Sequence, residues 1–257
     1  MFEGTPSPQE RKDIHAAYES ADPSKYSALP EKGKLRKTDR QPDSFYENRI
    51  HENADEQYVE VFQNPKLQQV ISRLLKGILN VSEVVQHPDQ DAVYLSRVLP
   101  TERIENKTPK GEMQADLIIL EALFGDADHE LKTLPILPLV SGTNFIRKKG
   151  RTAYYDFGAG SRMFSDVPEA AYEKIRHLNN PLAKQILLQK IRLLTEQFSG
   201  EAGKEFIASA LGTSTVKELF LEQPENADAS AFSDSAAFLQ KELMGRLERL
   251  EKTAKEQ

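Results

Sequence analysis

Residues 121–160 concentrate side chains whose types and spacing suit chemistry on a phosphate group. They contain Asp-Ala-Asp-His at 126–129, then Asn144 at the start of a short apolar run, then Asp-Phe-Gly at 156–158. Phosphoryl transfer from a nucleotide needs one carboxylate beside the accepting hydroxyl, together with an amide and a second carboxylate that hold the metal on the phosphates. Asp128 or Asp126 is the candidate for the first role, and Asn144 and Asp156 are the candidate metal ligands.

A buried helix is predicted immediately before the first of these motifs. Residues 111–125 place their apolar side chains largely on one side of a helix, and Gly125 stands where a C-terminal glycine would end it. The loop that carries Asp126 and Asp128 therefore leaves directly from a helix end, which is a rigid place to hold a reacting group.

A β-hairpin is predicted between the other two motifs. The sequence NFIRKKGRTAYYDFG has Phe145 and Ile146 on one arm, a turn at Lys149-Gly150, and residues 153–155 on the other arm. Such a hairpin would bring Asn144 and Asp156 to the same end of its two strands.

The remaining elements follow from apolar periodicity and turn residues. Residues 57–63 predict a strand, Asn64-Pro65 begins a helix that continues to about Asn80, and residues 81–100 predict two short strands around a turn at 87–89. Amphipathic helices are predicted at about 168–178, 180–198, 201–211, 213–221 and 233–254. The chain thus divides into a flexible tail (1–45), a small N-terminal region (46–100), a larger region (101–222), and a linker with a final helix (223–257).

The order of these elements resembles the C-terminal lobe of the protein-kinase-like superfamily, and especially its phosphatidylinositol-kinase-like and HipA-like branches. LIILEALFGDADH is similar to the helix and catalytic loop, NFIRKKGRTAYYDFG to the metal-binding hairpin, and AVYLSRVLP stands in the place of the hinge strand, so the resemblance covers residues 93–165. It implies an α+β, protein-kinase-like fold with a reduced N-terminal lobe and a mostly helical C-terminal lobe. It also implies that ATP and Mg²⁺ are bound, with Asp128 as the catalytic-loop residue, Asp126 competing for that role, and Asn144 and Asp156 as metal ligands. The acceptor is an unidentified hydroxyl, with a protein among the candidates.

Several features of that family are missing from this chain. The family's Asn follows the catalytic Asp by about five residues, where this chain has Thr133, so Asn144 fits only if residues 133–143 hold an insertion. Before residue 100 the only glycines are Gly4, Gly33 and Gly77, so there is no Gly-rich phosphate loop, and no strand supplies an obvious phosphate-binding Lys. Two alternatives therefore stay open: an inactive pseudokinase that serves as a binding module, and a helical interaction protein without a nucleotide site that uses 180–198 and 233–254 as partner surfaces.

Composition narrows the classes of function further. The chain has 257 residues and no cysteine, which excludes disulfides, thiolate metal sites and a cysteine nucleophile. A net charge of −6 argues against general nucleic-acid binding. No apolar run reaches the length of a transmembrane span and no signal-peptide pattern opens the sequence, so we expect a soluble, cytoplasmic protein.

Overall fold

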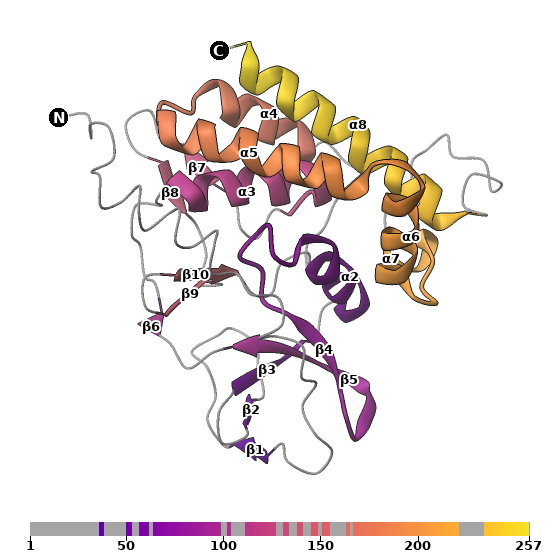
Figure 1. Cartoon of the computed structure of the whole chain (residues 1–257). Helices are drawn as coiled ribbons and strands as arrows, with labels where there is room; N and C mark the ends of the chain where they lie inside the picture. Colours follow the sequence, from indigo (N-terminus) through magenta and orange to yellow (C-terminus); the bar gives the residue numbers. More distant parts are fainter. Residues whose placement is uncertain are drawn as a thin grey trace.

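The protein folds into an antiparallel sheet and a larger layer of helices, as Figure 1 shows for the computed structural model. The structure describes residues 36–38, 50–52, 57–61, 64–98, 102–103, 111–126, 131–133, 138–140, 145–148, 151–154, 163–164, 167–220 and 234–256. The fold is α+β, which confirms the predicted class at this level.

The principal sheet has five antiparallel strands in the order β1-β2-β3-β5-β4. The prediction of one strand at 57–63 and of two strands around 87–89 is confirmed, but the two edge-side strands β1 and β2 were not predicted. Each of those has three residues, which is too short for alternation to be recognised in the sequence. The strand bounds are β1 (Arg36–Thr38), β2 (Ile50–Glu52), β3 (Gln57–Val61), β4 (Val84–His87) and β5 (Gln90–Val98).

Helix α2 (Pro65–Leu75) lies between β3 and β4 in the sequence and between the sheet and the helical layer in Figure 1. The predicted end near Asn80 was wrong. Lys76 leaves the helical conformation at ψ 130°, and Gly77 has φ +84°, which glycine adopts at no steric cost. The predicted start was right, although the Asn64 side chain does not cap the helix and instead donates to the carbonyl of Leu219 at 2.8 Å.

The helical layer matches the helices predicted after residue 165, with ends shifted by a few residues. Helix α5 begins where the sequence indicated, because the side-chain oxygen of Asn180 accepts hydrogen bonds from the N–H groups of Leu182 and Ala183. The helices are α3 (Gly111–Phe124), α4 (Val167–Arg176), α5 (Pro181–Phe198), α6 (Gly200–Leu211), α7 (Val216–Leu219) and α8 (Ser235–Lys255).

Two small sheets are built from strands that lie between β5 and α4 in the sequence, before and after α3. One joins β6 (Glu102–Arg103), β9 (Phe145–Lys148) and β10 (Arg151–Tyr154), with β9 in the middle. The other pairs β7 (Leu131–Thr133) with β8 (Pro138–Val140). The predicted hairpin around 149–150 is therefore confirmed as β9 and β10.

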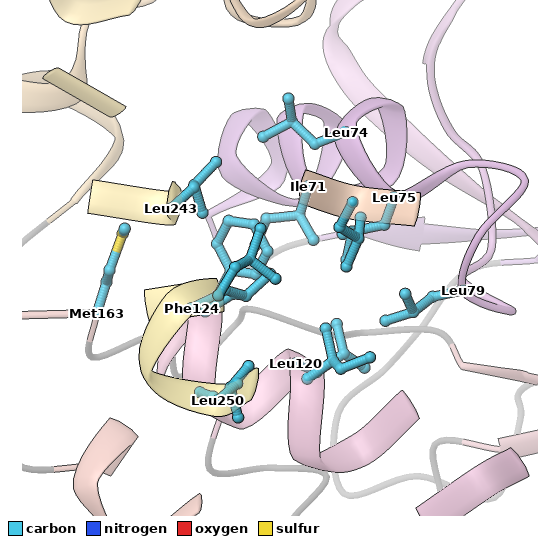
Figure 2. Close-up of a cluster of buried hydrophobic side chains, with 14 of the residues drawn as sticks. Ile71, Leu74, Leu75, Leu79, Leu120, Phe124, Met163, Leu243 and Leu250 are labelled. Atoms are coloured by element: carbon cyan, nitrogen blue, oxygen red, sulfur yellow. The ribbon is translucent and has the colours of Figure 1, made fainter. Parts of the chain in front are cut away.

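One hydrophobic core joins α2 to the helical layer. Figure 2 shows Ile71 and Leu75 of α2 packed toward Phe124 of α3, with Leu243 of α8 beside them, and all four side chains are buried. The predicted burial of α3 is confirmed, but its apolar side chains are not confined to one side of the helix. Every side chain from Met113 to Phe124 is buried, because α4, α5 and α8 pack around it. In the part of the chain that the structure describes, no helix is long and apolar enough to cross a membrane.

Candidate functional site

Asp126 directly follows the end of helix α3 and lies in the interior of the protein. Gly125 has φ +63° and its N–H donates to the carbonyl of Glu121 at 2.8 Å, so the helix ends at the glycine that the sequence indicated. Asp126 follows at once and is 1% exposed. It is the one predicted site residue within the described part of the chain.

The β9–β10 hairpin aligns the chain ends that lead to the two predicted metal ligands. In its register Phe145 pairs with Tyr154 and Lys148 with Arg151. Asn144 directly precedes Phe145 and Asp156 follows two residues after Tyr154, so both are attached to the same end of the hairpin. Asn144, Asp156 and Asp128 themselves lie outside the described residues, and their assignment stays a prediction.

The described residues hold no group of three or more His, Asp or Glu side chains that could bind a metal ion. The predicted ligands Asn144 and Asp156 are not among those residues, so this observation does not bear on them. The predicted donor set itself suits Mg²⁺, because an amide oxygen and a carboxylate supply the oxygen ligands that this ion prefers.

The strand and helix that would anchor phosphate in a kinase carry other residues here. Protein kinases use a Lys on the third strand, paired with a Glu on the following helix. In this chain β3 reads QYVEV and α2 reads PKLQQVISRLL, so neither the Lys nor the Glu is present. Glu60 of β3 is instead buried, with a carboxylate oxygen 3.4 Å from Nε2 of His51 on β2.

A second buried histidine completes this cluster in the sheet. The rings of His51 and His87 are 5.2 Å apart edge to face, and Nδ1 of His87 accepts the N–H of Asp89 at 3.1 Å. The five histidines are dispersed along the sequence, so their positions gave no indication that two of them meet. They lie on β2 and β4, which are not paired with each other in the sheet, so their contact depends on the three-dimensional shape of the fold.

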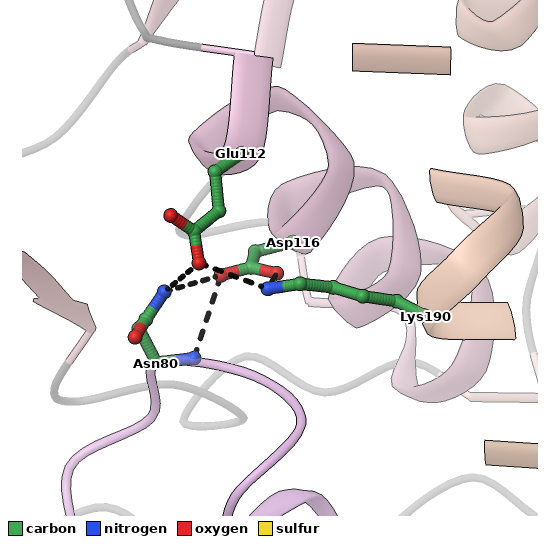
Figure 3. Close-up of polar contacts among 4 residues, drawn as sticks. All are labelled: Asn80, Glu112, Asp116 and Lys190. Carbon is green, nitrogen blue, oxygen red and sulfur yellow. Dashed lines mark hydrogen bonds and ion pairs between the residues drawn. The ribbon is translucent and has the colours of Figure 1, made fainter. Parts of the chain in front are cut away.

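A polar network of four residues links the segment after α2 to the helices. Figure 3 shows Lys190 of α5 beside Asp116 and Glu112 of α3, with Asn80 approaching from the segment after α2. The Asn80 amide nitrogen donates to Glu112 at 2.8 Å and to Asp116 at 3.1 Å. Burial raises the pKa of the Asp116 carboxyl, and the nearby Lys190 ammonium opposes that rise.

This network is a structural connection and lies away from Asp126. Asp116 and Asp126 are ten residues apart, of which most are helical, so they are separated by roughly 15 Å along α3. Perturbed pKa values occur in structural ion-pair networks as well as in active sites. The sequence carried a signal for this one, because Lys190 falls on the apolar stripe of α5 and Asp116 interrupts the apolar run of α3.

Comparisons with known proteins add no assignment: no family model, curated protein or solved structure matches the chain.

Proposed function

We propose that this protein is a kinase-like phosphotransferase that moves the γ-phosphoryl group of Mg²⁺-bound ATP to a hydroxyl acceptor. The supporting observation is the order of the described elements. An antiparallel sheet with one helix between its third and fourth strands is followed by a buried helix ending at Asp126, and then by a hairpin whose register aligns the chain ends that lead to Asn144 and Asp156.

In this proposal Asp156 and Asn144 hold the metal ion, and the metal neutralises the charge of the phosphates. Asp128 orients the acceptor hydroxyl. The burial of Asp126 favours Asp128 for that role, because a group that meets an acceptor must be reachable from solvent. Asp126 then serves to hold the start of the loop.

The absence of a Lys on β3 and of an acidic residue on α2 favours a second candidate, a pseudokinase that binds nucleotide or a partner without turnover. The third candidate, a helical interaction module, has less support. The apolar stripes of α5 and α8 are buried in the core of this protein, and Leu193 is the exposed large hydrophobic side chain among the described residues.

The test measures nucleotide binding and phosphoryl transfer separately. Calorimetric titration with ATP, with and without Mg²⁺, should show Mg²⁺-dependent binding that Asp156→Ala abolishes. Asp128→Ala should retain binding and lose transfer of ³²P from γ-labelled ATP to protein, lipid and small-molecule acceptors, and to the protein itself. Asp91→Ala removes an exposed carboxylate at the start of β5 and serves as the matched control.

The outcomes separate the three candidates. Mg²⁺-dependent binding without transfer to any acceptor would favour the pseudokinase. An absence of ATP binding under every condition would contradict the phosphotransferase and a pseudokinase that binds nucleotide. Binding that survives Asp156→Ala would contradict the assigned metal ligand.

A further inference from the structure

Arg246 on α8 makes two hydrogen bonds to backbone carbonyls that are far apart in the sequence. Its Nη1 donates to Ala122 at 3.0 Å and its Nη2 donates to Met163 at 2.5 Å. Ala122 belongs to the last turn of α3, where the final carbonyls of a helix have no partner within the helix. One guanidinium group therefore connects the end of α3 to the chain at Met163.

The segment between those two carbonyls contains every predicted site residue. Asp126, Asp128, Asn144 and Asp156 all lie after Ala122 and before Met163. The two attachment points are buried, with Ala122 at 0% and Met163 at 1% exposed.

We propose that Arg246 is a positioning residue that holds both ends of the 123–162 segment and so sets the geometry of the site within it. This inference rests on the proposed function for the identity of the site. The connection itself is carried by the described residues alone.

The surroundings of Arg246 indicate that burying its charged guanidinium group costs free energy. Burial lowers the pKa of the guanidinium, although Tyr172 and Glu242 oppose that change. The nearest carboxylate oxygen in an ion pair with Arg246 belongs to Glu242, at 3.9 Å, and the buried Nε of Arg246 finds no acceptor in the described part of the chain. A planar group with several donors can reach two carbonyls at once, whereas a lysine ammonium on a flexible stem lacks this fork.

Arg249, one turn along α8, provides a matched comparison. Its guanidinium pairs with both carboxylate oxygens of Glu169 and lies 4.1 Å from the centre of the Tyr172 ring. These contacts tie α8 to α4 and do not touch Ala122 or Met163. The two arginines therefore lie on the same helix but bind different parts of the protein.

The experiment compares Arg246→Lys with Arg249→Lys in the full chain by hydrogen–deuterium exchange and by titration with Mg²⁺-ATP. We expect Arg246→Lys to accelerate amide exchange about tenfold in peptides covering 120–133 and 160–166, with little change in the peptides of α5. The same substitution should weaken Mg²⁺-ATP binding about tenfold, and Arg249→Lys should produce neither local effect.

The two measurements fail independently. If the parent protein binds no Mg²⁺-ATP, the proposed function fails, and the exchange pattern still decides whether Arg246 holds both chain ends. Exchange that stays unchanged in the two peptides would overturn the inference. Exchange that rises evenly along the chain would also overturn the inference, because Arg246 would then contribute only to global stability. A variant that is fully unfolded would likewise overturn it.

Discussion

Lys190 of α5 and Asp116 of α3 form an ion pair in which both side chains are 0% exposed. The pair connects two helices of the helical layer, and Asn80 and Glu112 contact it (Figure 3). A buried charge pair of this kind adds little stability over an apolar pair, but it is costly to break from one side.

Lys190→Met should destabilise the protein by about 3–5 kcal/mol, because it leaves the Asp116 carboxylate buried without its cation. The double variant Lys190→Met/Asp116→Leu should recover most of that loss. Arg192→Met, which removes an exposed ion pair with Glu196 on the same helix, should cost about 0–1 kcal/mol. Urea unfolding followed by circular dichroism measures all three, and equal costs for Lys190→Met and Arg192→Met would contradict the prediction.

Asn80→Asp should destabilise the protein more than Asn80→Ala does. The alanine variant loses amide hydrogen bonds to Glu112 and Asp116, at a cost of about 1–3 kcal/mol. The aspartate variant loses the same donor and adds a negative charge beside two carboxylates. Midpoints of urea unfolding decide the order, and an aspartate variant as stable as the alanine variant would show that this site is open to solvent.

Stability should depend on pH through Asp116. Burial raises the pKa of its carboxyl, so the folded protein takes up this proton at a higher pH than the unfolded chain, in which Asp titrates near ~3.9. The resulting stabilisation is complete below that value and is lost as the pH rises through the raised pKa. Asp116→Asn cannot titrate, so the unfolding free energy of the parent minus that of this variant should increase from pH 7 to pH 4. A difference that is constant over this range would contradict the assignment.

Gly203→Ala should destabilise the junction between α5 and α6. A Cβ at Gly203 would lie 2.2 Å from the carbonyl carbon of Phe198, and backbone atoms cannot move aside as a flexible side chain can. Overpacking of this kind costs about 1–3 kcal/mol or more. Gly245→Ala is the matched control, since nothing lies within 4 Å of its Cβ and alanine favours a helix by about 1 kcal/mol. The melting temperatures should therefore shift in opposite directions.

Local sequence was sufficient to predict the elements that have a long apolar period or clear capping and turn residues. The start of α5 follows from Asn180-Pro181, the start of α2 from Pro65 in its first turn, the end of α3 from Gly125, and the β9–β10 hairpin from its turn at 149–150. These features depend on neighbours within a few residues, because caps, glycine conformations and two-residue turns are local interactions. The candidate residues Asp128, Asn144 and Asp156 also came from the sequence, and their convergence remains a prediction.

Tertiary structure alone decided the contacts between elements distant in the sequence. The meeting of His51 with His87 and the attachment of Ala122 and Met163 to Arg246 both join such elements. Periodicity reports which face of a helix is apolar, but it does not report which partner covers that face or which polar groups meet there. Lys190 on an apolar stripe signalled that a buried partner was needed, and only the packing of α5 on α3 determined that the partner is Asp116.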